Sequence, residues 1–195
     1  MYLRANIIVL LSFSKSKTIN FKVLFLRREI VRLEQKRGFI VLTNKEKMLN
    51  WNNIIKFANH GTPAPERRVE KTEAEWREIL TENQFKITRL AFTERAGSGE
   101  YCSSHEAGKY NCVCCDTPLF DSTIKFESGT GWPSFTEPIA ENAVNYIKDE
   151  SHGMVRVEAT CNTCYAHLGH VFPDGPAPSG LRYCINSDAL KLEQS

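Results

Sequence analysis

The sequence predicts a mainly β fold, with antiparallel strands around a core that a metal ion crosslinks and with short helices at the N-terminal end. Three observations lead to this prediction. Capped amphipathic segments occur between residues 50 and 90, short alternating segments broken by glycine and proline follow residue 95, and four cysteines form two C-x-x-C pairs. Alternation with frequent turns is typical of antiparallel sheets, and paired thiols suit a tetrahedral metal site.

Length and composition limit the class of protein. The chain has 195 residues, of which 42% are hydrophobic and 25% charged, as expected of a folded domain. Its apolar runs stay below the roughly 18 residues of a membrane-spanning helix, so a spanning protein is excluded. Residues 48–195 carry 14 basic and 20 acidic side chains, and such an acidic body is a poor partner for nucleic acid.

The first 47 residues differ from the rest in charge. They hold 11 basic and 3 acidic side chains, and a short apolar run at residues 7–11 precedes a stretch rich in serine and lysine. Such a segment is interpreted either as a targeting peptide or as a disordered or non-native extension upstream of Met48. We therefore divide the chain into this extension, a helical lead-in at residues 48–95 and a β domain at residues 96–195, with residues 48–195 forming one unit.

Capping signals place three helices in the lead-in. Asn50 and Gly61 mark the start and the end of the first expected helix. Thr72 and Thr81 mark the starts of the second and third helices. Each threonine is followed three residues later by Glu or Gln, which is the capping-box pattern. These helices are interpreted as scaffold for the domain that follows.

A β-hairpin is predicted near the middle of the second domain. Val155, Val157 and Ala159 alternate with polar residues, as in a strand that buries one face. Residues 144–148 supply the other arm, and the turn falls at residues 151–153.

Four cysteines have the spacing of a structural zinc site. Cys112 and Cys115 form one C-x-x-C pair, and Cys161 and Cys164 form the other. Two such pairs complete the tetrahedral S4 environment that zinc prefers, and a closed S4 site leaves no position open for chemistry. The 45 residues between the pairs exceed the gap of a zinc ribbon, so the ion joins distant parts of the domain. A redox C-x-x-C is the competing interpretation, but the βαβ pattern that accompanies it is not found.

The thiols left over are Cys102, Cys114 and Cys184. Cys184 follows Arg182, and His167 and His170 lie upstream of both. Arginine or protonated histidine stabilises the thiolate, the form in which a cysteine attacks. The same residues are also compatible with a buried cysteine and ordinary polar histidines, so the pattern by itself leaves both interpretations open.

Four motifs resemble a known family. In chain order they are G-T-G-W-P-S-F at residues 129–135, S-H-G-M-V-R at 151–156, A-H-L-G-H-V-F at 166–172 and G-L-R-Y-C-I-N-S at 180–187. They resemble the signature of the type B methionine sulfoxide reductases, the peptide-methionine (R)-S-oxide reductases. The resemblance runs from Glu66 to Leu190 and encloses both C-x-x-C pairs.

The resemblance implies two antiparallel sheets around a zinc-stapled core, with short N-terminal helices and the catalytic machinery in residues 96–195. It implies reduction of the R epimer of methionine sulfoxide, and thus protein repair, with Cys184 as the nucleophile that becomes a sulfenic acid. Trp132 is implied to pack against the substrate methyl group, with Phe172 in the apolar wall. The polar residues implied to line the site are His167, His170 and Asn186, which position or protonate the sulfoxide oxygen, and Arg182 beside the nucleophile.

The chain departs from many relatives at Thr130, where they carry a resolving cysteine. A subset of the family resolves through a cysteine in the region of Cys102, which lies here in a stretch rich in glycine and serine. The resemblance therefore implies a Cys102–Cys184 disulfide that thioredoxin reopens. Resolution by Cys114, or direct reduction of the sulfenic acid by a small thiol, are the alternatives.

The expected partners are thioredoxin and oxidised proteins or peptides, without nucleic acid or membrane, and the expected state is a monomer. We expect a cytoplasmic location, or an organelle or export if residues 1–47 are a targeting peptide. Two other functions are considered, a zinc-ribbon binding module and a thiol-based oxidant sensor. Neither would turn over methionine sulfoxide.

Overall fold

The computed structural model describes residues 31–36, 39–44, 48–153 and 155–194, and the chain divides into two compact units, residues 1–47 and 48–195. In the first unit, β1 (Val31–Lys36) pairs antiparallel with β2 (Phe39–Asn44). No pattern in residues 1–47 predicted this hairpin. The interpretation of residues 1–47 as a targeting, disordered or non-native segment falls mostly on residues 1–30, 37–38 and 45–47, which lie outside the described residues.

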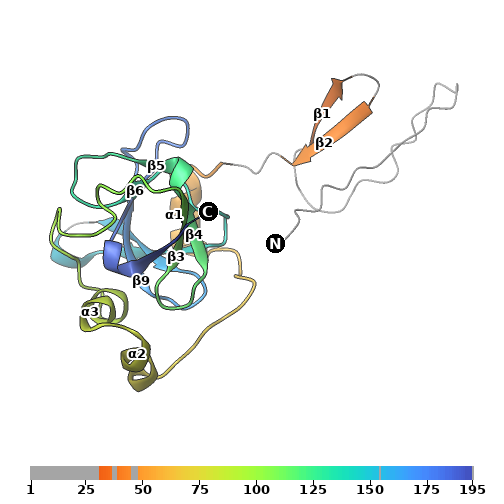
Figure 1. Ribbon diagram of the computed structural model, residues 1–195. Helices are drawn as coiled ribbons and strands as arrows, with labels where there is room; N and C mark the ends of the chain where they lie inside the picture. The colour runs from red at the N-terminus through yellow and green to blue at the C-terminus, as the bar shows by residue number, and fades with distance from the viewer. Residues whose placement is uncertain (1–30, 37–38, 45–47, 154, 195) are drawn as a thin grey trace, which may run out of the picture. The chain divides into compact units, whose positions relative to one another are not determined.

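The second unit contains the two antiparallel sheets that the resemblance implies (Figure 1). The larger sheet has the strand order β5-β6-β10-β9-β8-β7 and the smaller the order β11-β3-β4. In chain order the strands are β3 (Gly108–Cys112), β4 (Pro118–Asp121), β5 (Lys125–Phe126), β6 (Ser134–Phe135), β7 (Val144–Asp149), β8 (Arg156–Cys161), β9 (His167–Phe172), β10 (Arg182–Ile185) and β11 (Leu190–Gln194). Three single turns of 3-10 helix, η1 (Ser122–Ile124), η2 (Ser151–Gly153) and η3 (Ser187–Ala189), connect them.

Three helices precede the sheets, as predicted: α1 (Trp51–His60), α2 (Glu73–Ile79) and α3 (Glu82–Leu90). Thr72 and Thr81 cap α2 and α3 through reciprocal bonds with the third helical residue, which confirms both capping boxes. Asn50 caps α1 in the same way, and α1 ends before Gly61. None of the helices in the described part of the chain has the length and apolar character needed to cross a membrane.

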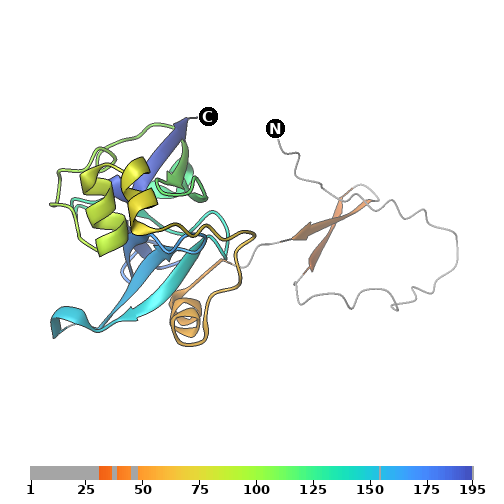
Figure 2. The ribbon, with the colours of Figure 1, turned by 90° about the horizontal axis from the view of Figure 1, so that it is seen from below.

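The helices lie in two places on the body (Figures 1 and 2). The ring of Phe57 in α1 stacks on Tyr146 in β7 at 5.9 Å, and Ile54 beside it is fully buried. α2 and α3 pack on each other away from α1, and α3 contacts β9 and η3. Helix α3 therefore adjoins the segment that directly follows β10.

Aromatic side chains fill the core between the two sheets. Phe120 in β4 stacks on Phe135 in β6 at 4.4 Å and also meets the ring of Tyr183 in β10 at 5.6 Å. The Tyr183 hydroxyl bonds that of Tyr146 at 2.8 Å, which satisfies both buried groups. Since successive strand residues face opposite sides of a sheet, burying Tyr183 sends Cys184 to the other face.

The predicted hairpin is present and projects from the body (Figure 2). Its arms are β7 and β8, and η2 forms the turn at the predicted place. The second arm begins at Arg156, one residue later than the alternation indicates, and Val155 before it is 75% exposed.

Candidate functional site

Cys184 lies in β10, between strands β6 and β9. Its cross-strand partners are Ser134 on one side and His170 on the other. Glu158 in β8 stands opposite His170 in turn, so thiol, imidazole and carboxylate follow one another across the sheet. Directly opposed residues on one face have Cβ atoms about 5 Å apart, close enough to interact.

Each of the two predicted histidines is bonded to a carboxylate. His167 Nδ1 is 2.6 Å from Glu158 Oε1, and His170 Nε2 is 2.8 Å from Asp149 Oδ2. A carboxylate only accepts, so these nitrogens carry the hydrogens. His167 is 4% exposed, and its Nε2 is buried without a hydrogen-bond partner among the described residues.

The electrostatics favour a neutral His170 beside an ionised Asp149. Burial lowers the pKa of His170, and the bond to Asp149 offsets only part of that effect. The pKa of Asp149 is lowered by hydrogen bonds from Ser151, with smaller contributions from His170 and Arg156. Because an unperturbed imidazole titrates near pH ~6.5, His170 is neutral at pH 7 with Nδ1 as its basic nitrogen.

Burial raises the pKa of the Cys184 thiol. The Thr130 hydroxyl, 3.9 Å from Sγ, and the Arg182 guanidinium lower it, but they do not outweigh the loss of solvent. The resting residue is therefore a thiol. The sequence shows the nearby arginine and histidines but not the burial, so it overstates the activation of this cysteine.

The Arg182 side chain lies beside Cys184, and Asp174 and Phe172 hold it in place. It donates two bonds of 2.9 Å to the Asp174 carboxylate, and its guanidinium stacks 4.5 Å from the centre of the Phe172 ring. Phe172 lies opposite Arg182 in the sheet and 6.3 Å from the ring of His170. Both predicted residues thus lie on the face that carries Cys184.

Trp132 and Asn186 meet at Glu94, a residue that sequence reasoning missed. Trp132 Nε1 donates to the Glu94 carbonyl at 3.2 Å. The Asn186 amide accepts from Glu94 N at 3.0 Å and donates to the Leu168 carbonyl at 2.9 Å. Asn186 is 2% exposed, and its amide bonds two backbone groups. Its expected contact with the sulfoxide oxygen stays a prediction. No motif signals Glu94, because its partners lie 38 to 94 residues away.

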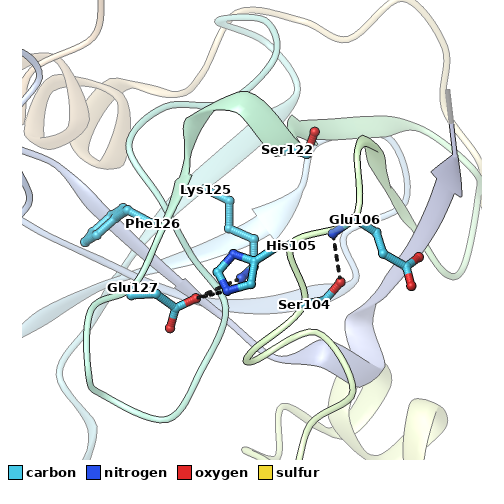
Figure 3. A pocket seen from close by; sticks show the side chains of 7 residues that line it. All are labelled: Ser104, His105, Glu106, Ser122, Lys125, Phe126 and Glu127. Carbon is cyan, nitrogen blue, oxygen red and sulfur yellow. Dashed lines mark hydrogen bonds and ion pairs between the residues drawn. The ribbon is translucent and has the colours of Figure 1, made fainter.

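Cys102 lies on a loop beside β5, the edge strand of the larger sheet, and only β6 separates β5 from β10. The buried Lys125 side chain of β5 donates to the Cys102 carbonyl at 3.3 Å, and a hollow of about 180 Å³ lies next to this contact (Figure 3). Cys102 and Cys184 are both free and partly exposed, whereas Cys114 is buried. The two thiols are not joined by a disulfide in this structure.

The four cysteines predicted to bind zinc come together. Their sulfurs all lie within 4.8 Å of one another, and the shortest distances are 3.7 Å between Cys112 and Cys164 and 3.6 Å between Cys115 and Cys161. Tetrahedral Zn–S bonds of about 2.3 Å place sulfurs about 3.8 Å apart, so the cluster fits a zinc ion. It joins the end of β3 to the end of β8, one strand from each sheet.

The sequence is similar to those of known proteins. Residues 80–194 match the SelR domain. The peptide methionine sulfoxide reductase MsrB of Pseudomonas entomophila strain L48 is 58% identical over 127 residues, which are 65% of this chain and 97% of that protein. The MsrB of Pseudomonas fluorescens strain Pf0-1 is 58% identical over 125 residues (64% and 95%), and that of Saccharophagus degradans strain 2-40 is 57% identical over 126 residues (65% and 94%).

Proposed function

Because this chain belongs to the SelR family of peptide methionine sulfoxide reductases, we propose that it reduces the R epimer of methionine sulfoxide in oxidised proteins, with Cys184 as nucleophile. The family itself supports reduction of methionine sulfoxide and protein repair in general. The observation that carries the proposal is the placement of Cys184 directly opposite His170, on the sheet face that the core leaves free.

In the proposed first step, the sulfur of Cys184 attacks the sulfoxide sulfur. Neutral His170 offers Nδ1 for the thiol proton, and His167 in its doubly protonated form donates its Nε2–H to the sulfoxide oxygen while Nδ1 stays bonded to Glu158. The oxygen is transferred to Cys184, so methionine sulfoxide is reduced by two electrons and the thiol is oxidised to a sulfenic acid that retains the proton. Trp132 and Phe172 supply apolar contacts for the substrate methyl group.

In the proposed second step, the Cys102 thiol condenses with the sulfenic acid, releasing water and forming the Cys102–Cys184 disulfide. The partial exposure of Cys102 supports this choice over the buried Cys114. A dithiol reductant, for which we propose thioredoxin, then reduces the disulfide by exchange. When zinc is bound by the four clustered cysteines it stabilises the fold and takes no part in these steps.

The activity is tested by incubating the protein with dithiothreitol and each epimer of a methionine sulfoxide peptide. We expect methionine from the R epimer only, and none after Cys184→Ser. Conversion of the S epimer, or activity that survives Cys184→Ser, would contradict the proposal.

The resolving thiol is tested without reductant, by peptide mass mapping after one equivalent of substrate. We expect a 102–184 bridge in the wild type and in Cys114→Ser, and a persistent sulfenic acid in Cys102→Ser. A 114–184 bridge would assign the role to Cys114 instead.

We also propose a monomer in a reducing compartment such as the cytoplasm, because free thiols and a thiolate zinc site persist where disulfides do not form. An organelle or export is the alternative if residues 1–47 direct the chain there. Thioredoxin with its reductase should replace dithiothreitol in the assay, and an inactive mixture would exclude it as the reductant.

A further inference from the structure

Glu94 uses each of its backbone and side-chain polar groups to join parts of the site. Its carboxylate accepts from Ser187 N at 2.8 Å and from Asp188 N at 3.1 Å, in the turn that directly follows β10. Its backbone N–H donates to Asn186 Oδ1, and its carbonyl accepts from Trp132 Nε1. One residue therefore connects the turn after the nucleophile to the indole.

The loop that carries Glu94 is packed closely against both of these segments. Gly97 N donates to the Gly131 carbonyl at 2.8 Å, next to Trp132 in the chain. A Cβ atom built on Gly131, whose φ is +92°, would lie 2.9 Å from Ala96 Cβ and 2.9 Å from Gly97 N. A Cβ atom on Gly99 would lie 2.2 Å from Ser187 Oγ. These approaches leave little room for the loop to shift while the Glu94 bonds remain.

The order of the bonds shows how the residue acts. The two backbone N–H groups fix the Glu94 carboxylate, the carboxylate fixes its own backbone, and the backbone carbonyl then holds the Trp132 indole at a set place relative to Cys184. A bond to an ionised acceptor is stronger than one between neutral groups, so the carboxylate is the strongest link in this series. Burial nevertheless raises the pKa of Glu94, because only part of the lost hydration is replaced.

We propose that Glu94 is a positioning residue that aligns the Trp132 indole with Cys184 for recognition of the substrate methyl group. This inference depends on the proposed function for its substrate. Glu94 does not touch the reacting atoms, so its removal should weaken substrate binding more than it slows the chemical step.

The test compares Glu94→Ala and Glu94→Gln with Glu100→Ala, an exposed acid on the same loop. With the R epimer of a methionine sulfoxide peptide and dithiothreitol, we expect Glu94→Ala to raise KM about tenfold with a smaller change in kcat. Glu94→Gln keeps one acceptor oxygen and should lie between Glu94→Ala and the wild type. Glu100→Ala should match the wild type. If Glu94→Ala does not fold, Glu94→Gln still tests the inference through an intermediate KM.

A spectroscopic measurement separates this inference from the proposed function. Acrylamide quenching of Trp132, obtained as the difference from the same protein carrying Trp132→Phe, should increase in Glu94→Ala and not in Glu100→Ala. Unchanged quenching and KM in both Glu94 variants would overturn the positioning role. A wild type without reductase activity would refute the proposed function, and the quenching result would still decide whether Glu94 holds the indole.

Discussion

Replacing Asn186 by alanine is expected to lower the stability of the fold as well as the reductase activity. The resemblance places this residue at the sulfoxide oxygen, but its amide is buried and bonded to two backbone groups. The two roles predict different results for the same variant. A residue that only contacts substrate can be removed at little cost to folding, whereas a buried amide with two backbone partners cannot.

The expected loss of stability follows from the two bonds. The Leu168 carbonyl keeps its bond from the backbone N–H of residue 186, so the side-chain bond to it is worth about 1 kcal/mol. The N–H of Glu94 loses its acceptor, and an unsatisfied buried donor costs about 1–3 kcal/mol. Together the free energy of unfolding should fall by about 3 kcal/mol.

The assay is urea unfolding of the zinc-loaded protein, followed by circular dichroism. The free energy of unfolding falls by about 2 kcal/mol for each mole per litre of urea, so Asn186→Ala should lower the urea concentration at the unfolding midpoint by about 1.5 M. Asn145→Ala is the control, since that amide makes a single bond of 3.2 Å to Thr160 on the same sheet. It should lower the midpoint by about 0.5 M. An Asn186→Ala midpoint equal to that of the wild type, with activity lost, would refute the structural role and return Asn186 to the substrate.

Three further predictions concern the thiols and one histidine. The Thr130 hydroxyl is 3.9 Å from Cys184 Sγ, so Thr130→Cys places a second sulfur near the nucleophile. Peptide mass mapping after one turnover should then show a 130–184 disulfide. A disulfide from Cys184 to Cys102 alone would contradict this prediction. Because the pKa of His170 is lowered by folding, its contribution to stability is present above the unfolded value of about 6.5 and is lost as pH falls. The difference in urea midpoint between wild type and His170→Gln should therefore shrink from pH 8 to pH 5, and a constant difference would show that His170 does not couple to folding. Cys161→Ser removes one sulfur of the four-cysteine cluster that fits zinc, so it should abolish stoichiometric zinc binding and lower the urea midpoint. Full zinc content of the variant by metal analysis would exclude the four-cysteine site.

Features that depend on neighbours in the chain could be predicted from the amino-acid sequence alone. A capping residue bonds a backbone group three positions ahead, so Thr72 and Thr81 mark their helices directly. The C-x-x-C spacing presents two sulfurs from one turn, which is why Cys112 and Cys161 could be assigned to a metal with no structure. Strand alternation is equally local, and it located the hairpin to within one residue.

Features that depend on burial and on distant partners became visible only in the folded chain. Loss of solvent, and not the charges near it in the chain, sets the direction of the pKa shift of Cys184. Asn186 and Glu94 are 92 residues apart in sequence, yet their hydrogen bond makes Asn186 a support for the loop that holds Trp132. Desolvation and long-range hydrogen bonds arise only when strands from separate parts of the chain pack together, so no local pattern could have carried this information.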